Sequence, residues 1–253
     1  MTMKFSHSGK IGDALYSIPF CRACLEKTGN LYFKFNLQKD VKHVANVMER
    51  ENVMLTEGAC QFIKPLLEWQ PFIEEVTISS SVPQNAFDLS IVRKQMHNFG
   101  SGDIRLWYQS CVNDHLDIDL TKPSLEAPFD DRLKDKIIIC MTERYVPAEV
   151  DMSALKEFAS SLVFIGTDFE HQRFCSRYFG IERVIVKDAL ELAGLMKGCK
   201  CVISNLNGNY AIGESLKCKR ICLMPDLMKI EFGRYAGRVT IGPMNVIPQR
   251  WLV

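Results

Sequence analysis

The stretch Ser6–Pro19 reads SHSGKIGDALYSIP and joins the first strand-like run of the chain to its first helical pattern. The run MKFSHS at residues 3–8 predicts a short strand, and DALYSIPFCRACLEKTG at residues 13–29 predicts a helix. Gly9 and Gly12 lie in the turn between them, and Asp13 follows Gly12 directly. Ligands of open α/β sheets bind beyond the carboxyl ends of the strands, so this turn is a candidate site.

The same alternation of strand and helix continues along the chain. Further strand-like runs are expected at residues 30–36, 73–79, 86–92, 136–142, 162–166, 183–186, 200–205 and 219–225. Further helical patterns are expected at residues 41–51, 59–70, 101–113, 151–161, 168–180, 188–199 and 208–218. Apolar strands that alternate with helices are typical of parallel sheets covered on both faces. We therefore predict an α/β protein with parallel sheets.

One segment interrupts the alternation. Residues 120–132, LTKPSLEAPFDDR, contain two prolines among mixed polar residues and predict a linker, which is also our hinge candidate. The strand–helix pattern then restarts. Two such blocks in tandem predict two Rossmann-like domains that face each other across a cleft, residues 1–122 and residues 133–253.

Composition excludes several classes of protein. The 253 residues are 47% hydrophobic and carry a net charge of +1, which argues against a bulk electrostatic grip on nucleic acid or on an anionic membrane. We expect no signal peptide and no membrane span, because no run of roughly 18 apolar residues occurs.

The ten cysteines do not predict a disulfide framework. Cys140, Cys201 and Cys222 lie inside apolar strand-like runs and are expected to be small buried hydrophobic residues. Cys21 and Cys24 form a C-x-x-C pair within a predicted helix, and no second such pair completes a tetrahedral site. We therefore expect no metal site and reduced thiols, as in a cytoplasmic protein.

The opening turn allows two interpretations of Asp13. Gly9 and Gly12 would let backbone N–H groups approach a ligand at the positive end of the helix. A carboxylate in the first helical turn either caps the helix or acts as a general base that faces a ligand. The turn matches neither the dinucleotide fingerprint G-x-G-x-x-G nor the phosphate loop G-x-x-x-x-G-K-[ST].

The last predicted strand-to-helix turn of the second block is also rich in polar groups. Asn205-Leu-Asn207-Gly208 follows the run at residues 200–205, and its backbone amides at a helix N-terminus would suit a diphosphate. Glu214 lies about two turns into the following helix, where it either reaches a ribose hydroxyl pair or is a solvated helix acid. A plain turn is the alternative for the whole segment.

Two further turns carry candidate binding groups. Thr142 and Arg144 follow the first strand of the second block, and Arg144 either holds a phosphate or forms a surface ion pair. Gly166-Thr167-Asp168 ends another strand, and by itself it predicts an ordinary turn with Thr167 or Asp168 as helix cap.

Taken together, these stretches resemble the ADP-heptose:lipopolysaccharide heptosyltransferases and their relatives, a glycosyltransferase family with the two-Rossmann fold called GT-B. The family has a Gly-Asp at its first strand–helix turn, with a proline a few residues on, as in KIGDALYSIP here. It has a strand like YDLVID, compared with FDLSIV, and a GT/GAxxE turn, compared with FIGTDFEHQRF. The family pattern LxELAxLIxxAxxxVxNDSGxxHLAAALGxP is similar to residues 190–219.

This resemblance implies an inverting, metal-independent transfer of a sugar from a nucleotide-diphospho-sugar to an acceptor hydroxyl. Asp13 matches the catalytic base of the family, the first domain would bind the acceptor, and the second would bind the donor. The acceptor is unknown: a saccharide, a lipid-linked glycan or a modified nucleobase. The donor-binding residues implied are Lys10, Gly12, Thr142, Arg144, Gly166, Asn205, Asn207, Gly208 and Glu214.

Other functions remain open. Leu206 stands where the family has an aspartate, which leaves a non-catalytic nucleotide or nucleotide-sugar binding protein of the same fold as the alternative. A virus-encoded enzyme that glycosylates a modified DNA base is a lesser one, and an oxidoreductase or a redox protein using Cys21 and Cys24 is a third class. Basic residues of the first block would face either an anionic acceptor or water: Lys39, Lys42, His43, Arg93, Lys94, His97 and Arg105.

Overall fold

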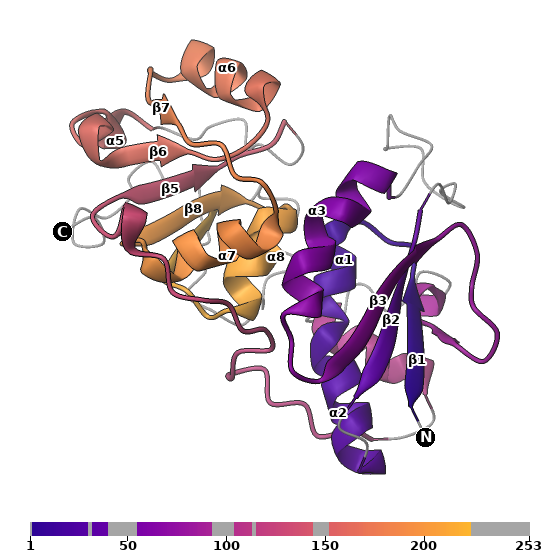
Figure 1. The fold of residues 1–253 in the computed structure, drawn as a ribbon. Helices are drawn as coiled ribbons and strands as arrows, with labels where there is room; N and C mark the ends of the chain where they lie inside the picture. Colours follow the sequence, from indigo (N-terminus) through magenta and orange to yellow (C-terminus); the bar gives the residue numbers. More distant parts are fainter. Residues whose placement is uncertain are drawn as a thin grey trace.

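The computed structural model describes residues 2–29, 32–39, 55–92, 104–112, 115–143 and 152–223. It holds two sheets, one in each half of the chain, and every strand pair in both sheets is parallel (Figure 1). The predicted α/β class with parallel sheets is therefore confirmed.

The first half contributes a four-stranded sheet in the order β3-β2-β1-β4. Its strands are β1 (Met3–His7), β2 (Phe33–Gln38), β3 (Ile73–Ser79) and β4 (Phe87–Asp88). Its helices are α1 (Ile11–Tyr16), α2 (Ile18–Thr28), α3 (Glu57–Glu68) and α4 (Ile104–Trp107), and α4 continues into the 3₁₀ helix η2 (Tyr108–Cys111).

The second half contributes a five-stranded sheet in the order β7-β6-β5-β8-β9. Its strands are β5 (Ile137–Cys140), β6 (Leu162–Phe164), β7 (Glu182–Arg183), β8 (Cys201–Asn205) and β9 (Arg220–Leu223). Its helices are α5 (Ser153–Lys156), α6 (Asp168–Arg177), α7 (Ala189–Gly198) and α8 (Gly208–Ser215), together with the 3₁₀ helices η3 (Asp131–Leu133) and η4 (Ala159–Ser161).

The strand order places the candidate turns at special positions. β1 lies between β2 and β4, and β5 lies between β6 and β8, so the order reverses beside β1 and beside β5. Ligands of doubly wound sheets bind outside the carboxyl ends of the strands at such switch points. The turn after β1 and the turns after β5 and β8 are among those whose residues the sequence singled out.

The predicted helix at residues 13–29 is divided into α1 and α2 at Ser17. Pro19 has no N–H group, and its ring would clash with the carbonyl of Leu15 in a regular helix. At the junction, the Ser17 hydroxyl donates to the Ala14 carbonyl at 2.7 Å. α2 ends at Gly29, which has the left-handed φ of 72° that helix C-termini favour.

Several other predicted elements are shorter than expected. The strand predicted at residues 86–92 is only β4, because the Asp88 carboxylate accepts the N–H of Ser90 at 3.0 Å and starts a turn. The strand predicted at residues 183–186 is only β7, a short edge strand. Two predicted helices tighten into 3₁₀ turns, at η2 and at η4. The helix predicted at residues 41–51 lies outside the described residues.

The apolar core joins the two halves. One cluster includes Phe5 and Leu15 from the first half and Ile138, Tyr210 and Ala211 from the second. A separate cluster fills the other face of the second sheet, with Ile137, Ile139 and Phe164 among its members. Successive residues of β5 thus enter opposite clusters, as expected for a sheet covered on both faces.

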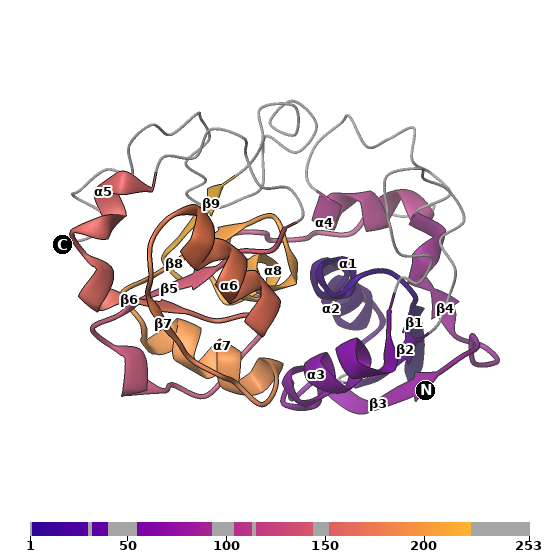
Figure 2. The ribbon, with the colours of Figure 1, turned by 90° about the horizontal axis from the view of Figure 1, so that it is seen from above.

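The helices between the two sheets form the contact between the halves. α1 packs against α8, and α3 packs against α7 (Figures 1 and 2).

The predicted linker is held to both sides. The amide of Ser124 donates to the Ser215 carbonyl at 2.8 Å, and the Gln70 side chain both donates to and accepts from the backbone of Glu126, at 2.9 and 2.8 Å. The domain boundaries at 122 and 133 stay a prediction.

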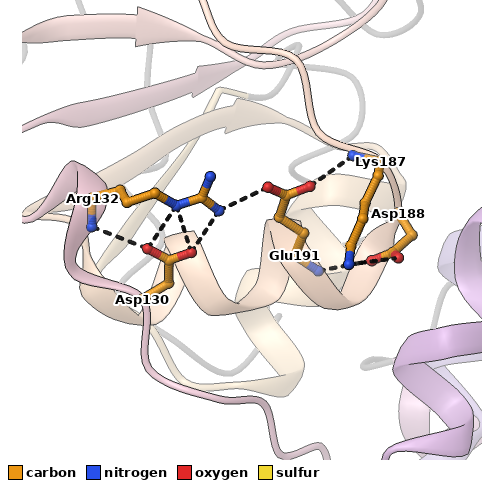
Figure 3. Close-up of polar contacts among 5 residues, drawn as sticks. All are labelled: Asp130, Arg132, Lys187, Asp188 and Glu191. Atoms are coloured by element: carbon orange, nitrogen blue, oxygen red, sulfur yellow. Dashed lines mark hydrogen bonds and ion pairs between the residues drawn. The ribbon is translucent and has the colours of Figure 1, made fainter.

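The end of this connecting segment, residues 128–132, is fastened to α7. Arg132 pairs with the Asp130 carboxylate and reaches Glu191 at 2.7 Å, while Glu191 also accepts the backbone N–H of Lys187 at 2.8 Å (Figure 3). The Asp188 side chain caps α7, because it accepts the N–H of Glu191 at 2.9 Å. The segment lies so close to α7 that a Cβ added at Gly198 would be 1.8 Å from the Asp130 carbonyl oxygen.

A buried ion cluster also crosses the contact. Glu214 of α8 is fully buried and pairs with Arg105 of α4, with Lys217 and with Arg220. Arg105 is itself 3% exposed, so the expectation that it faces an anionic acceptor or water is wrong. Lys39 pairs with Glu57 at 2.6 Å, and the other basic residues considered in the first block lie outside the described ones.

The cysteines concern the expectation of reduced thiols, and the helices concern the expectation that the chain has no membrane span. All ten cysteines lie in the described part of the chain, and none is in a disulfide. Burial, with Cys24 nearby, raises the pKa of the Cys21 thiol well above its ordinary value, which disfavours redox chemistry at the C-x-x-C pair. No described helix has the length and apolar character needed to cross a bilayer.

A first prediction concerns the close contact at Gly198. Gly198→Ala is expected to lower the free energy of unfolding by about 1–3 kcal/mol, because the new methyl group meets backbone that cannot easily move. Gly58→Ala is the matched control, since Gly58 also lies in a helix but has nothing within 4 Å of an added Cβ. It is expected to stabilise by up to about 1 kcal/mol. Urea unfolding of both variants is the measurement, and equal effects would contradict the close contact.

A second prediction concerns the ion cluster. Glu214→Gln removes the carboxylate that three cations share, whereas Arg105→Met removes one of the three pairs. Glu214→Gln is therefore expected to cost about 3–5 kcal/mol, and Arg105→Met clearly less. Chemical unfolding at neutral pH compares the two, and a larger loss for Arg105→Met would show that Glu214 is not the centre of the cluster.

Candidate functional site

Asp13 lies in the first turn of α1, directly beyond the carboxyl end of β1. Its carboxylate oxygen Oδ2 accepts the backbone N–H of Lys10 at 3.1 Å. The helix-capping interpretation of Asp13 is thus confirmed as a contact. The contact is also compatible with a general base, because the hydrogen bond from the Lys10 N–H orients the carboxylate. The general-base role of Asp13 stays a prediction.

Gly9 is required by crowding in this turn. A Cβ added at Gly9 would lie 2.5 Å from Cε1 of His7, 2.7 Å from Oδ2 of Asp13 and 2.8 Å from the Asp13 Cβ. No side chain fits between that ring and that carboxylate. The two glycines of the opening turn therefore have different surroundings. Gly9 is enclosed by residues of its own turn, whereas Gly12 faces Ala211 and Asn207 of the second half.

Two residues that the sequence analysis missed complete the turn. His7 is fully buried at the end of β1, and its Nδ1 accepts the N–H of Gly9 at 2.8 Å. Its Nε2 lies 2.9 Å from the hydroxyl of Tyr108, which donates to the backbone carbonyl of Asp13 at 2.8 Å. The alternation of β1 places His7 on the same face as Phe5, which was a usable signal for burial. Nothing in the sequence pointed to Tyr108.

The turn after β8 is organised by Asn207. The Asn207 side chain caps α8 by accepting the N–H of Tyr210 at 3.0 Å, and its Nδ2 donates to the Cys140 carbonyl at 2.9 Å. The same Nδ2 lies 2.8 Å from Oδ1 of Asn205. Asn207 thus connects the first turn of α8 with the end of β5, and its amide is committed to protein partners.

Asn205 joins this turn to the one after β5. Its side-chain oxygen accepts the N–H of Thr142 at 3.1 Å, and its Nδ2 donates to the Thr142 carbonyl at 2.8 Å. Asn205 is fully buried, so it acts on the loop that begins at Thr142 and not on solvent. Arg144, two residues further on, lies outside the described residues.

The structure brings the opening turn and the turn after β8 into direct contact. A Cβ added at Gly208 would lie 3.1 Å from Cγ2 of Ile11, and one added at Gly12 would lie 3.8 Å from the Cβ of Ala211. Gly208 therefore allows the starts of α1 and α8 to approach each other across the two halves, whereas a Cβ at Gly12 would meet Ala211 at an ordinary contact distance. The opening turn and the turn after β8 thus lie side by side although they are about 200 positions apart in sequence.

Gly166 lies apart from this pair of turns, after β6. Its added Cβ would be 2.7 Å from the Phe164 ring and 3.0 Å from the Glu170 carboxylate. Thr167 and Glu170 form a reciprocal cap of α6, and Arg183 donates to the Gly166 carbonyl at 3.1 Å. The predicted capped turn is confirmed, and a role of Gly166 toward the donor stays a prediction.

Glu214 is not presented at the turn after β8. Its carboxylate is buried in the ion cluster with Arg105, Lys217 and Arg220, so the interpretation as a solvated helix acid is wrong. The ribose contact stays a prediction, but the cluster already occupies this carboxylate.

The arrangement has the parts that a displacement reaction uses. A carboxylate lies on one side of the contact between the turns, and the start of α8, with its partial positive charge, lies on the other. Lys10 adds a cation one residue before α1. Within the described ranges, no group of three or more His, Cys, Asp or Glu side chains is arranged to hold a metal ion.

Known proteins share this fold at low sequence identity. The heptosyltransferase II structure from E. coli is 12% identical and aligns over 100% of this chain and 96% of its own with a TM-score of 0.56. A family 9 glycosyl transferase from Veillonella parvula is 11% identical, with a TM-score of 0.52 over 87% of this chain and 80% of its own. E. coli heptosyltransferase WaaC, solved with ADP-2-deoxy-2-fluoro heptose, is 11% identical, with a TM-score of 0.51 and 88% of each chain covered.

No protein-family model matches the sequence, and no curated protein does. Identities of this size establish the fold and leave the chemistry to the residues. The resemblance drawn from the motifs is therefore confirmed at the level of architecture: the chain has the two-domain GT-B-like fold of the heptosyltransferases.

Proposed function

We propose that the protein is an inverting glycosyltransferase that moves a sugar from a nucleotide-diphospho-sugar to an acceptor hydroxyl, with Asp13 as general base and without a metal ion. The observation that carries the proposal is the contact between the turns at Gly12 and Gly208. It unites a carboxylate from one sheet with the start of a helix from the other. The shared fold with heptosyltransferases supports the same reaction class.

In the proposed step, the Asp13 carboxylate takes the proton of the acceptor hydroxyl as its oxygen attacks the anomeric carbon. The bond from that carbon to the diphosphate oxygen breaks, and the nucleoside diphosphate leaves with the electron pair. Attack and departure occur on opposite faces of the sugar, so the anomeric configuration inverts. The contact with the Lys10 N–H would orient the carboxylate for this step.

The leaving diphosphate needs positive groups, because charge develops on it as the bond breaks. Backbone amides at the start of α8, near Gly208, and the Lys10 ammonium would supply them. Thr142 would add a polar contact from the loop that Asn205 holds in place. Arg144 follows in the same loop and remains a proposed phosphate ligand by its position in the sequence.

A nucleotide-binding protein without transfer activity is the second candidate. Two observations favour it: Leu206 replaces the acidic residue of the family pattern, and the Asp13 carboxylate has a structural role as helix cap. The two candidates share the donor-binding turns and differ in what Asp13 does. Experiments on binding and on transfer therefore separate them.

A nucleoside diphosphate of the correct base is expected to stabilise the chain. Ligand at 100 times its dissociation constant adds about 2.7 kcal/mol of stability. Thermal unfolding with a panel of nucleoside diphosphates and sugar nucleotides, without metal and then with magnesium, measures the effect. We expect a shift that does not require magnesium. No shift with any member of the panel would contradict both candidates.

Asp13→Asn separates the base from the cap, because an amide oxygen still accepts the Lys10 N–H but cannot take a proton. We expect kcat to fall by about 10²–10⁴-fold while the nucleotide-induced thermal shift is kept. Asp13→Ala loses the cap as well and is expected to cost stability in addition. Transfer at the wild-type rate by Asp13→Asn would exclude Asp13 as the base.

A further inference from the structure

A chain of buried hydrogen bonds holds both ends of the turn that carries Asp13. It runs from the Gly9 N–H to His7, from His7 to the Tyr108 hydroxyl, and from that hydroxyl to the Asp13 carbonyl, over 2.8, 2.9 and 2.8 Å. His7 and Tyr108 are both fully buried. The Tyr108 ring also packs on Phe20 of α2, with ring centroids 6.1 Å apart.

The direction of each hydrogen bond in this chain follows from its ends. A backbone N–H only donates, so Nδ1 of His7 carries no proton. A backbone carbonyl only accepts, so the Tyr108 hydroxyl uses its proton on Asp13. The remaining contact must then be a donation from Nε2–H of His7 to the Tyr108 oxygen. His7 is therefore a neutral imidazole with its proton on Nε2.

The turn needs such support because its own helix is short. α1 has six residues, Ile11–Tyr16, and isolated helices of that length are not stable in water. The Asp13 carbonyl accepts from Tyr108 as well as from the Ser17 N–H, which lies 3.1 Å away. The ring of His7 and the Asp13 carboxylate also leave no space for a side chain at Gly9.

We propose that His7 and Tyr108 are positioning residues that fix the Asp13 carboxylate in its reactive orientation. The inference rests on the proposed function and deepens it, since it names what orients the base. Neither residue touches the reacting atoms: His7 acts through Gly9, and Tyr108 acts through the Asp13 backbone. Their loss should therefore slow the chemical step without weakening substrate binding.

Tyr108→Phe tests this role, because it removes the hydroxyl and keeps the ring. We expect kcat to fall roughly 10- to 100-fold with KM for donor and acceptor unchanged, as for a small misplacement of a catalytic group. Tyr178→Phe is the matched control. The Tyr178 hydroxyl is buried without a hydrogen-bond partner in the described part of the chain, so its removal should leave kcat unchanged. Equal kcat values for the two variants would overturn the inference.

Partial rescue at position 7 supplies a second test. His7→Asn places an amide oxygen near the position of Nδ1 and can still accept the Gly9 N–H, whereas His7→Leu cannot. We expect His7→Asn to retain more of kcat than His7→Leu at similar thermal stability. The reverse order, or a change of KM in both variants with kcat unchanged, would contradict a positioning role.

The ring nitrogens of His7 provide a readout that does not depend on activity. In ¹⁵N-histidine NMR spectra of the full chain, assigned by the loss of one signal in His7→Asn, we expect the neutral Nε2–H form at neutral pH. An Nδ1–H form or a charged ring would overturn the inference. Wild-type protein that transfers no sugar would overturn the proposed function, and the tautomer would still decide whether His7 and Tyr108 hold the turn.

Discussion

The close approach of α1 and α8 is the constraint on which the rest of the site depends. The two helices follow strands of different sheets, and an added Cβ at Gly208 would lie 3.1 Å from Cγ2 of Ile11, so glycine at this position leaves room for them to meet. Because each helix begins at a switch point of its sheet, the contact joins the two places where such sheets bind ligands.

Buried polar networks keep both turns in one conformation. On the side of the first sheet, His7 and Tyr108 bind backbone atoms of the opening turn, and on the other side Asn205 and Asn207 bind the backbone of β5 and its loop. A satisfied hydrogen bond in the interior is strong, and an unpaired polar group there is costly. Each network therefore defines one geometry, which is what a reacting group needs.

The connection between the halves is bound to both of them. Residues 120–132 have the prolines and polar side chains of a flexible segment, yet Gln70 pairs with the Glu126 backbone and Arg132 is fastened to α7. Backbone groups that leave solvent must find partners, and here both halves provide them. Together with the shared apolar cluster and the Arg105–Glu214 pair, this contact makes the arrangement of the turns a property of the whole chain.

The sequence by itself determined the α/β class, the order of most strands and helices, the capped turn at residues 167–168, and the polar turns that follow the carboxyl ends of strands. These follow from local periodicity, glycine and capping residues, which act over a few positions. It did not reveal that Glu214 is buried among cations or that Tyr108 holds Asp13. The partners in those contacts lie 109 and 95 residues apart. Only tertiary packing, within the first half for Tyr108 and between the two halves for Glu214, decides which such distant side chains meet, because no local pattern records it.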